Sequence, residues 1–565
     1  MKKHYETHVE DTDKLISVAG PILEYKSWYE QYRKLMEEQA QRKYGLYTPT
    51  SEGDEDDFPS IPGMIARYSA SGLTNEQMAA NPVWVDKTGN GHDLQMKNFS
   101  WKGMSGVGGY GDENHQTFYK FTLDDYVFIA TPPGVKHMNF TFRVTGLQPG
   151  NKLTLAFFGT TNTVYGTWNK DGIYTVDADI VEAGKPTYFY NGYSATRGEF
   201  TIEILPLYPG ALVFDGVDDY GVCDNFPILT KEKGYTVVVL RQWDQDFLNT
   251  TLTGGLLSTR NYSTGEGVAF EKIESSNKGY WNLGAGGIID FAKSPFTWQT
   301  SKQYNNVGIL KGDKNHGKPL CVGCGLSGGQ QCGRFAIWEL VFLDHDATEE
   351  ELTKIKDYFV KTYPWLFPDQ AWTVVGKTNE DEDRATIANI TGNGNDLVLS
   401  NFGFAEGSGY NEQGEYAGYL VTDGVDDKIT SSIFEMGNDW TVIGDWELIN
   451  TGKNDNAGIV KFNSIIIYNY NNRTLINIKN GRNILIPDQN TINAVCSDGR
   501  IYSKDWKESI YNEETESTSK NLLTIGYSGN NYTKIAFRNL AIYPTVLSKE
   551  DCIKAYNYLQ TLKAK

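Results

Sequence analysis

The pentapeptide Asp-Gly-Val-Asp-Asp occurs twice in this chain of 565 residues, and no other feature constrains the fold as strongly. It lies in LVFDGVDDYGV from Leu212 and in LVTDGVDDKIT from Leu420, each time behind an apolar run. A repeated element has to be placed before local structure, because a missed repeat misassigns the whole fold. The flanking sequence shows that the repeat extends well beyond these five residues.

Further segments match in the same order on both sides of the pentapeptide. These matches are TGNGHDLQMKNF from Thr88 with TGNGNDLVLSNF from Thr391, YTVVVLRQW from Tyr235 with WTVIGDWEL from Trp440, LCVGCG from Leu320 with LTIGYS from Leu523, and AIWELVFLDHDATEEELTKIKDYF from Ala336 with AFRNLAIYPTVLSKEDCIKAYNYL from Ala536. Landmarks that recur in one order indicate a duplicated domain.

The spacing between landmarks reveals an insertion in the first copy. Asp93 and Asp215 are 122 positions apart, whereas the matching Asp396 and Asp423 are 27 apart, so the first copy holds 95 extra residues. These residues, about 110–208, alternate strand-like runs with Gly and Asn punctuation, as in FTFRVTGLQPGNKLTLAFFG, which predicts two strands joined by a Pro-Gly turn. We therefore expect a small β-sandwich inserted in a surface loop, where insertions are tolerated.

The rest of the chain also predicts an all-β protein. Gly (58), Tyr (35), Phe (26) and Trp (13) are frequent, and turn residues separate short aromatic and β-branched runs. Each copy ends in its one clear helix signal. Thr348 and Ser548 precede acidic residues at capping spacing, and the helices are expected to run to about Tyr363 and Leu562.

The first 60 residues differ from the repeats. Tyr25, Trp28, Tyr32 and Leu35 recur at helical spacing, which predicts an amphipathic helix over about 22–43, followed by the acidic linker SEGDEDDFPSIP. An apolar stripe ahead of a linker has no core of its own. It is expected to dock either on the body of this protein or on another chain.

Three of the shared elements carry a resemblance to a known family. The D-x-T-G-N-G-x-D element at Asp86 to Asp93, the F-D-G-V-D-D-Y element at Phe214 to Tyr220, and the closing strand with its short helix resemble laminin G-like, or concanavalin A-like, jelly-roll domains. The second copy departs from that pattern at Asn389 and Thr422. The resemblance implies two such sandwiches, and the expected organisation is 1–60 as a helical attachment segment and linker, 61–109 with 209–366 as the first jelly roll, 110–208 as the insertion, and 367–565 as the second jelly roll.

Each pentapeptide has three interpretations. Asp-Gly suits a tight turn between strands, and an Asp side chain can accept hydrogen bonds from the amides of its own turn. Clustered Asp oxygens also suit calcium, which some members of the family bind, and Asp219 and Asp427 are the candidate ligands. Catalysis is disfavoured, since the E-x-D-x-x-E strand pattern of related glycosidases does not occur, and no catalytic residue is predicted.

The remaining candidate residues are cysteines and tryptophans. Cys321, Cys324 and Cys332 leave open buried thiols, a structural metal or a disulfide, because C-x-x-C resembles a zinc knuckle but the repeat aligns it with an ordinary strand. Sandwich domains of this family often bind glycans through aromatic platforms. Trp243 and Trp446 are the predicted platform residues, from a wider set that also contains Trp281, Trp298 and Trp440.

Charge and targeting signals narrow the function. A net charge of −19 disfavours nucleic acid, the N-terminus lacks the apolar core of a signal peptide, and no apolar run is long enough to span a membrane. A protein made in the host cytoplasm that works outside it suggests a virion surface protein. The Tyr-, Asn- and Gly-rich style and the tandem jelly rolls resemble structural proteins of phages of gut Bacteroidales, including crAss-like phages.

That resemblance implies a non-enzymatic head or tail fibre-like appendage. Its expected partners are capsid or tail proteins, host surface polysaccharide and further copies of the same chain. The alternatives are a carbohydrate-active enzyme or depolymerase with lectin-like modules, and a bacterial surface adhesin.

Overall fold

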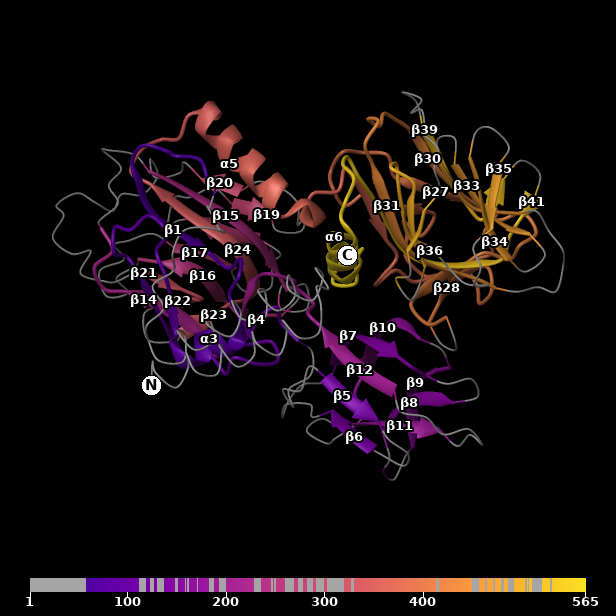
Figure 1. Ribbon diagram of the computed structural model, residues 1–565, viewed down its shortest axis with the longest axis horizontal. Coiled ribbons are helices and arrows are strands. Elements are labelled where there is room, and N and C mark those ends of the chain that lie inside the picture. Colours follow the sequence, from indigo (N-terminus) through magenta and orange to yellow (C-terminus); the bar gives the residue numbers. More distant parts are fainter. Residues whose placement is uncertain are drawn as a thin grey trace, which may run out of the picture. The chain divides into compact units, whose positions relative to one another are not determined.

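The computed structural model is an assembly of β-sheets with few helices (Figure 1). It describes residues 57–564 apart from gaps, of which the longest are 111–117, 130–136, 193–199, 228–234, 260–268, 291–298, 302–319, 450–456 and 511–520. The predicted N-terminal helix, with Tyr25, Trp28, Tyr32 and Leu35, lies outside the described residues. Residues 59–565 form a compact unit separate from residues 1–58.

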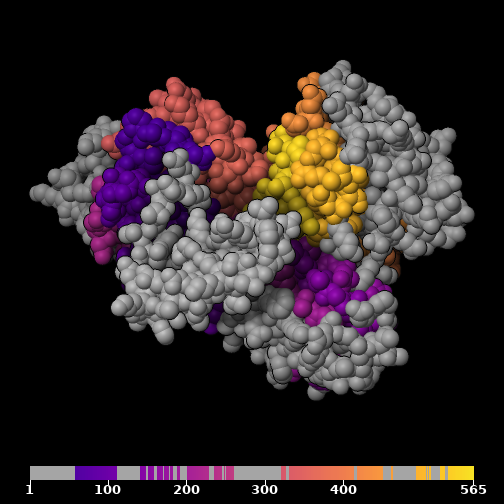
Figure 2. Space-filling model, in the orientation of Figure 1, coloured from indigo at the N-terminus to yellow at the C-terminus, as the bar shows by residue number. Residues whose placement is uncertain are grey.

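The first jelly roll consists of two antiparallel sheets built from both sides of the insertion. Its front sheet has the order β20-β15-β24-β13-β4, with β1 paired to β24, and its back sheet the order β19-β18-β17-β16-β21-β14-β3-β2, extended by β22 and β23. The front strands are β1 (Met64–Ser69), β4 (Gly106–Val107), β13 (Leu212–Asp215), β15 (Thr236–Trp243), β20 (Gln299–Ser301) and β24 (Arg334–Leu343). The back strands are β2 (Val83–Trp84), β3 (Leu94–Lys97), β14 (Tyr220–Cys223), β16 (Gly254–Ser258), β17 (Ala269–Lys272), β18 (Lys278–Trp281), β19 (Ile288–Asp290), β21 (Leu320–Val322), β22 (Cys324–Leu326) and β23 (Gln330–Cys332). In Figure 2 the indigo surface of residues 57–110 adjoins the salmon surface of the segment around and after β24, with which β1 is paired.

The second jelly roll repeats the strand order of both sheets and differs at their ends. Its front sheet has the order β36-β31-β42-β29-β28, with β25 paired to β42 and β37 and β38 added beyond β36, and its back sheet the order β35-β34-β33-β32-β39-β30-β27-β26. The front strands are β25 (Gln370–Thr373), β28 (Gly409–Asn411), β29 (Tyr419–Val421), β31 (Thr441–Leu448), β36 (Ile492–Cys496), β37 (Arg500–Ser503), β38 (Glu508–Ile510) and β42 (Ile535–Tyr543). The back strands are β26 (Thr386–Ile387), β27 (Leu397–Ser400), β30 (Lys428–Phe434), β32 (Ala457–Phe462), β33 (Ile465–Tyr470), β34 (Arg473–Ile478), β35 (Arg482–Leu485) and β39 (Asn521–Ile525), with the separate hairpin β40 (Tyr527–Ser528) and β41 (Asn531–Tyr532). The duplication read from the sequence is therefore a duplication of the whole sandwich.

The strands between β4 and β13 form two sheets of their own. One has the order β10-β7-β12-β5 and the other β6-β11-β8-β9. Their bounds are β5 (Phe118–Phe121), β6 (Tyr126–Ile129), β7 (His137–Thr145), β8 (Lys152–Phe157), β9 (Thr163–Trp168), β10 (Gly172–Asp179), β11 (Thr187–Gly192) and β12 (Phe200–Leu205). Phe142 of one sheet packs edge-on against Phe189 of the other, with ring centroids 4.9 Å apart. The two strands predicted around the Pro-Gly element form, but β7 and β8 lie in different sheets, so their connection crosses the sandwich.

The helices begin where the capping patterns predict. In α5 (Glu349–Thr362) Thr348 and Glu351 form a reciprocal capping box, and in α6 (Lys549–Leu559) the Ser548 hydroxyl accepts a hydrogen bond from the Asp551 amide. The second helix ends at Leu559, three residues earlier than predicted. A short helix, α3 (Asn75–Ala80), was not predicted from the sequence.

Helix α5 covers a buried ion pair that the second jelly roll lacks. The Arg67 guanidinium on β1 donates to both carboxylate oxygens of Glu339 on β24, at 3.1 and 3.2 Å, and to the Tyr358 hydroxyl of α5 at 2.9 Å. The matching register positions on β25 and β42 are Ala371 and Asn539. One shared scaffold thus accepts either an ion pair or a smaller uncharged pair beneath its helix.

Candidate functional site

Each Asp-Gly-Val-Asp-Asp segment carries the chain from the front sheet to the back sheet. We call residues 215–219, between β13 and β14, the first acidic corner, and residues 423–427, between β29 and β30, the second. Gly216 and Gly424 have φ angles of 77° and 75°, and a Cβ at Gly216 would lie 2.8 Å from that of Arg334. Only glycine fits both the left-handed backbone and this close approach.

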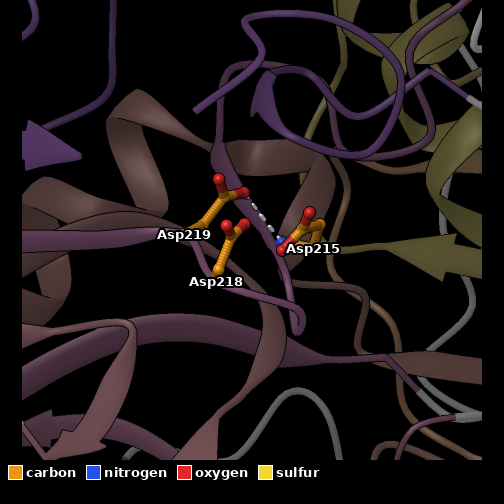
Figure 3. A group of neighbouring side chains, drawn as sticks. All are labelled: Asp215, Asp218 and Asp219. Atoms are coloured by element: carbon orange, nitrogen blue, oxygen red, sulfur yellow. Dashed lines mark hydrogen bonds between the residues drawn. The ribbon is translucent and has the colours of Figure 1, made fainter. Parts of the chain in front are cut away.

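The aspartates of each corner bind backbone amides of the corner itself. In the first corner the Asp215 amide donates to Asp219 Oδ2 at 3.0 Å, and the Val217 amide donates to Asp215 Oδ1 at 2.8 Å. Figure 3 shows the first of these bonds and the three carboxylates beside it. In the second corner Asp427 and Asp423 make the same two bonds, each at 2.7 Å. The structure thus supports the turn interpretation in both copies.

The corners are also tied to the loop that follows β3 or β27. Ser105 Oγ donates to Asp219 Oδ1 at 2.9 Å, and Ser408 Oγ donates to Asp427 Oδ1 at 3.1 Å. The Asn98 side chain donates to the Asp218 carbonyl at 3.0 Å, and an asparagine in the second copy makes the same bond. Sequence reasoning missed these partners, although the Asn-Phe that ends both TGNG landmarks was a signal for the asparagines.

Burial makes the inner aspartate of each corner a weak acid. Asp219 is fully buried, and this desolvation, followed by the charge of Asp215, raises its pKa to about 8 even though its two hydrogen bonds lower it. Desolvation likewise raises the pKa of Asp427 to about 6. The first corner therefore resists full ionisation at neutral pH, which a bound cation would relieve.

Calcium binding at the corners remains a prediction. Ligand oxygens of Asp215, Asp218 and Asp219 lie within 4.8 Å of one another, as do those of the second corner. Calcium takes six to eight oxygens, but both oxygens of Asp219 already accept hydrogen bonds. The exposed Asp218 and Asp426 are therefore better placed to contribute ligands than the predicted Asp219 and Asp427.

The D-x-T-G-N-G-x-D element also serves the backbone. Asp86 Oδ1 accepts from the Arg67 amide at 3.1 Å and from the Thr88 amide at 3.0 Å, while Asp93 Oδ1 accepts from the Asp86 amide at 2.8 Å. Asn389, the departure in the second copy, keeps the equivalent acceptor bonds, and its amide group donates to Gln370. The substitution changes the charge of this loop and preserves its geometry.

The prediction that Trp243 and Trp446 form glycan platforms is wrong. Their side chains are 2% and 1% exposed and belong to the cores of the first and second jelly roll. Trp440 is buried as well, whereas the side chains of Trp281 and Trp298 lie outside the described residues. A ring enclosed on both faces has no surface for a sugar.

The cysteine cluster resolves in favour of the disulfide. Cys324 on β22 pairs with Cys332 on β23, directly across a hairpin that packs beside Tyr220 at the end of the first corner. Cys321 is buried next to them, and desolvation raises the pKa of its thiol to about 12. We call residues 324–332 the first rim hairpin. Because a thiol that stays protonated is a poor nucleophile, Cys321 does not exchange readily with its disulfide neighbour.

The second copy has aromatic rings where the first has its disulfide. Tyr527 and Tyr532 are cross-strand partners in the hairpin of residues 527–532, which we call the second rim hairpin, and their ring centroids lie 5.7 Å apart. Lys428, which follows the second corner as Tyr220 follows the first, has its Nζ 5.4 Å and 5.9 Å from these centroids. All three side chains are partly exposed. This is the aromatic surface that the tryptophans do not provide.

One acidic pair on a strand was not predicted from the sequence. Asp445 and Glu447 flank the inward-facing Trp446 on β31, and the Tyr419 hydroxyl donates to both oxygens of Asp445 at 3.2 Å. Asp445 is only 5% exposed. An acid enclosed in this way cannot reach a polymeric substrate without rearrangement, so the pair does not form an accessible carboxylate dyad.

Comparisons with known proteins give distant similarities only. No protein-family model matches the chain, and no curated protein matches it. The receptor-binding domain of botulinum neurotoxin type G is similar over 34% of this chain, with a TM-score of 0.21 and 12% identity, and that of the C/D mosaic serotype over 34%, with a TM-score of 0.25 and 10% identity. In both cases the match covers 50% of the toxin chain. Trypanosoma rangeli sialidase in complex with sialic acid is similar over 76% of this chain and 83% of its own, with a TM-score of 0.26 and 9% identity. The fold assignment therefore rests on the sheets and registers described above.

Proposed function

We propose that this protein is a non-enzymatic structural protein of a phage virion, a head or tail fibre-like appendage. Residues 1–60 attach it to capsid or tail proteins and assist its oligomerisation. The jelly rolls project from the particle and bind host surface glycan or another virion protein. Function then lies in surfaces carried on a repeated scaffold rather than in a catalytic cleft.

The contrast between the two copies is the observation that carries this proposal. The corners, their serine and asparagine partners and the strand order are the same in both jelly rolls, while the rim hairpins differ completely in chemistry. A constant frame with variable exposed loops is the usual arrangement of binding domains. An enzyme duplicated for catalysis would be expected to keep its chemical groups in at least one accessible cluster.

The use of acidic side chains also favours binding over hydrolysis. In the described residues, the first and last acids of each corner and the acids of the TGNG loops accept backbone hydrogen bonds, and Asp445 is enclosed against Tyr419. No helix of the described part of the chain is long and apolar enough to cross a membrane.

The attachment role is tested by deleting residues 1–45. Because residues 59–565 form their own compact unit, the truncated protein is expected to stay folded and soluble but to be missing from assembled particles. A matched pair of full-length variants sharpens the result: alanine at Tyr25, Trp28, Tyr32 and Leu35 should abolish incorporation, and alanine at the polar Glu37 and Glu38 should not. Normal incorporation of the truncated chain would contradict the anchor.

The enzymatic alternative has a direct test. The full-length protein is incubated with capsular polysaccharide from the host, and released reducing ends are measured over time. We expect none above the rate of a heat-denatured control. Sustained release would replace the proposal with a depolymerase.

A further inference from the structure

The two rim hairpins occupy equivalent positions in the two jelly rolls, but different side chains join their strands. In each copy a glycine with positive φ, Gly323 or Gly526, leads into the hairpin, and its carbonyl accepts the amide of Gly333 or Thr533 at 2.9 or 2.8 Å. One cross-strand pair then joins the two hairpin strands, a disulfide in the first copy and two tyrosines in the second. The backbone conformation at the base of the hairpin is therefore the same in both copies, and in both a side-chain pair closes the hairpin.

Joining the strands does not require exposed rings. Cys324 and Cys332 accomplish it while 0% and 5% exposed, whereas Tyr527 and Tyr532 present part of their rings to solvent. A cross-strand aromatic pair stabilises a hairpin less than a disulfide does. The tyrosine pair therefore joins the hairpin strands less strongly than the disulfide does, but it exposes more side-chain surface to solvent.

Polar groups of both kinds surround these rings. Lys428 places its ammonium over the junction of the two tyrosines. Asp426 is exposed on the adjoining corner, where Asn401 holds its carbonyl. Lys534 packs its backbone against Gly424, and its Nζ lies 3.9 Å from the point that a Cβ on Gly407 would occupy. One ammonium donor therefore lies over a partly exposed aromatic pair, and the segments that adjoin this pair along the chain supply a carboxylate and a second ammonium group.

We propose that this rim of the second jelly roll, formed by Asp426, Lys428, Tyr527, Tyr532 and Lys534, binds a neutral glycan. The inference rests on the proposed function, in which the jelly rolls bind host glycan, and names the site. The C–H groups of a sugar pack on those parts of the tyrosine rings that remain exposed, while its hydroxyls accept from ammonium groups and donate to a carboxylate.

Charge excludes other ligand classes at this rim. Lys428 already lies over the electron-rich ring faces, so a second cation would be repelled. The acidic corner lies alongside, and the chain carries a net charge of −19, which disfavours nucleic acid and strongly anionic polysaccharides. A ligand with many hydroxyls and no charge meets neither obstacle.

The experiment measures binding of the full-length protein to an array of neutral and acidic host-type glycans, followed by titration of the best neutral ligand. Tyr527→Ala with Tyr532→Ala is expected to weaken binding at least about ten-fold. Tyr527→Phe with Tyr532→Phe, which keeps both rings and the hairpin closure, should stay within about three-fold of the unmodified protein. Asp426→Asn should weaken binding, because it removes the charged acceptor.

The matched control is Cys324→Ser with Cys332→Ser, which alters the same position of the first jelly roll and should leave binding unchanged. Unaltered affinity in the double alanine variant would overturn the site while leaving glycan binding by the protein intact. A protein that binds no glycan on the array would overturn the site together with the proposed glycan function. Binding restricted to acidic glycans would overturn the assignment of a neutral ligand.

Discussion

Replacing Asp219 with asparagine should remove a pH dependence that belongs to the first corner alone. Asparagine can keep both contacts, since its Oδ1 can accept from the Asp215 amide and its Nδ2 can donate to Ser105 Oγ, which now serve Asp219 at 3.0 and 2.9 Å. The substitution therefore removes the ionisation of this side chain and retains its geometry.

The direction of the pH dependence of stability follows from the raised pKa of Asp219. An unfolded aspartate titrates near about 3.9, whereas burial raises the pKa of Asp219 to about 8, so between these values the folded state holds a proton that the unfolded state has lost. Stability is then highest at low pH and falls by about 1.4 kcal/mol per pH unit as pH rises toward 8. From pH 6 to pH 8 the expected loss is about 2 kcal/mol.

Asp427 provides the matched control. Its pKa is raised only to about 6, so its titration is half complete at the start of that interval and nearly complete by pH 7, and its expected loss from pH 6 to pH 8 is about 0.4 kcal/mol. Asp219→Asn should therefore flatten the pH dependence in this range, and Asp427→Asn should barely change it. The two variants alter the equivalent side chain, one in the first corner and one in the second.

Local hydrogen exchange is the appropriate assay, because a chain with several domains has no single unfolding transition. Mass spectrometry of peptides that span each corner gives the free energy of opening at pH 6, 7 and 8, after correction for the intrinsic pH dependence of exchange. A wild-type and an Asp219→Asn protein with equal slopes would refute the reasoning. Asp219 would then be ionised in the folded protein, as a resident cation would make it.

Three further predictions concern the stability of the jelly rolls. Arg67→Ala should destabilise the first jelly roll by about 3–5 kcal/mol, because it leaves the Glu339 charge buried without its partner, and adding Glu339→Asn, which reproduces the second copy, should restore most of the loss, measured by hydrogen exchange of peptides from that jelly roll. Unfolding without reductant should expose four titratable thiols of the six cysteines, since Cys324 and Cys332 are paired, and reduction should lower stability by about 2–3 kcal/mol for a ring of this size. If the corners hold calcium, millimolar calcium should slow amide exchange around the first corner and Asp218→Asn should remove the effect, whereas a calorimetric titration without heat would contradict the prediction.

The sequence predicted the frame of this fold well because the chain contains its own comparison. The interval between Asp93 and Asp215, against that between Asp396 and Asp423, located the insertion without any structural information. The capping residues located both closing helices, because a cap is a local pattern with local partners. Features that depend on only a few neighbouring residues, such as helix caps and repeated motifs, could therefore be predicted from the sequence.

Which side chains are exposed to solvent could not be predicted from the sequence in the same way. Val237, Val239 and Trp243 of β15 all face the first core, yet Ala336 and Trp338 on the other face of this sheet belong to a second buried cluster. When both faces of a sheet are covered, alternation has no polar phase from which to tell core from surface. The tryptophans were mistaken for platforms for this reason.

The disulfide stayed one of three alternatives and the tyrosine pair was not predicted, because each depends on contact across a hairpin. Aligning Cys324 with Tyr527 correctly identified a shared position, but it was used as evidence of an ordinary strand rather than of a closure that both copies need.

Positions at which the two copies keep the same residue indicate what the scaffold requires, as the corner aspartates do. Where the two copies share a backbone geometry but carry different residues, the scaffold does not depend on the identity of the side chain. The rim hairpin is such a position, and it lies at the surface. The insertion lies at another, because its ends at β4 and β13 are held side by side by the Val213–Gly106 pairing that β28 and β29 make without it. Changes at either place leave the hydrogen bonds of the corner untouched, so these are the surfaces on which the two jelly rolls could acquire different partners.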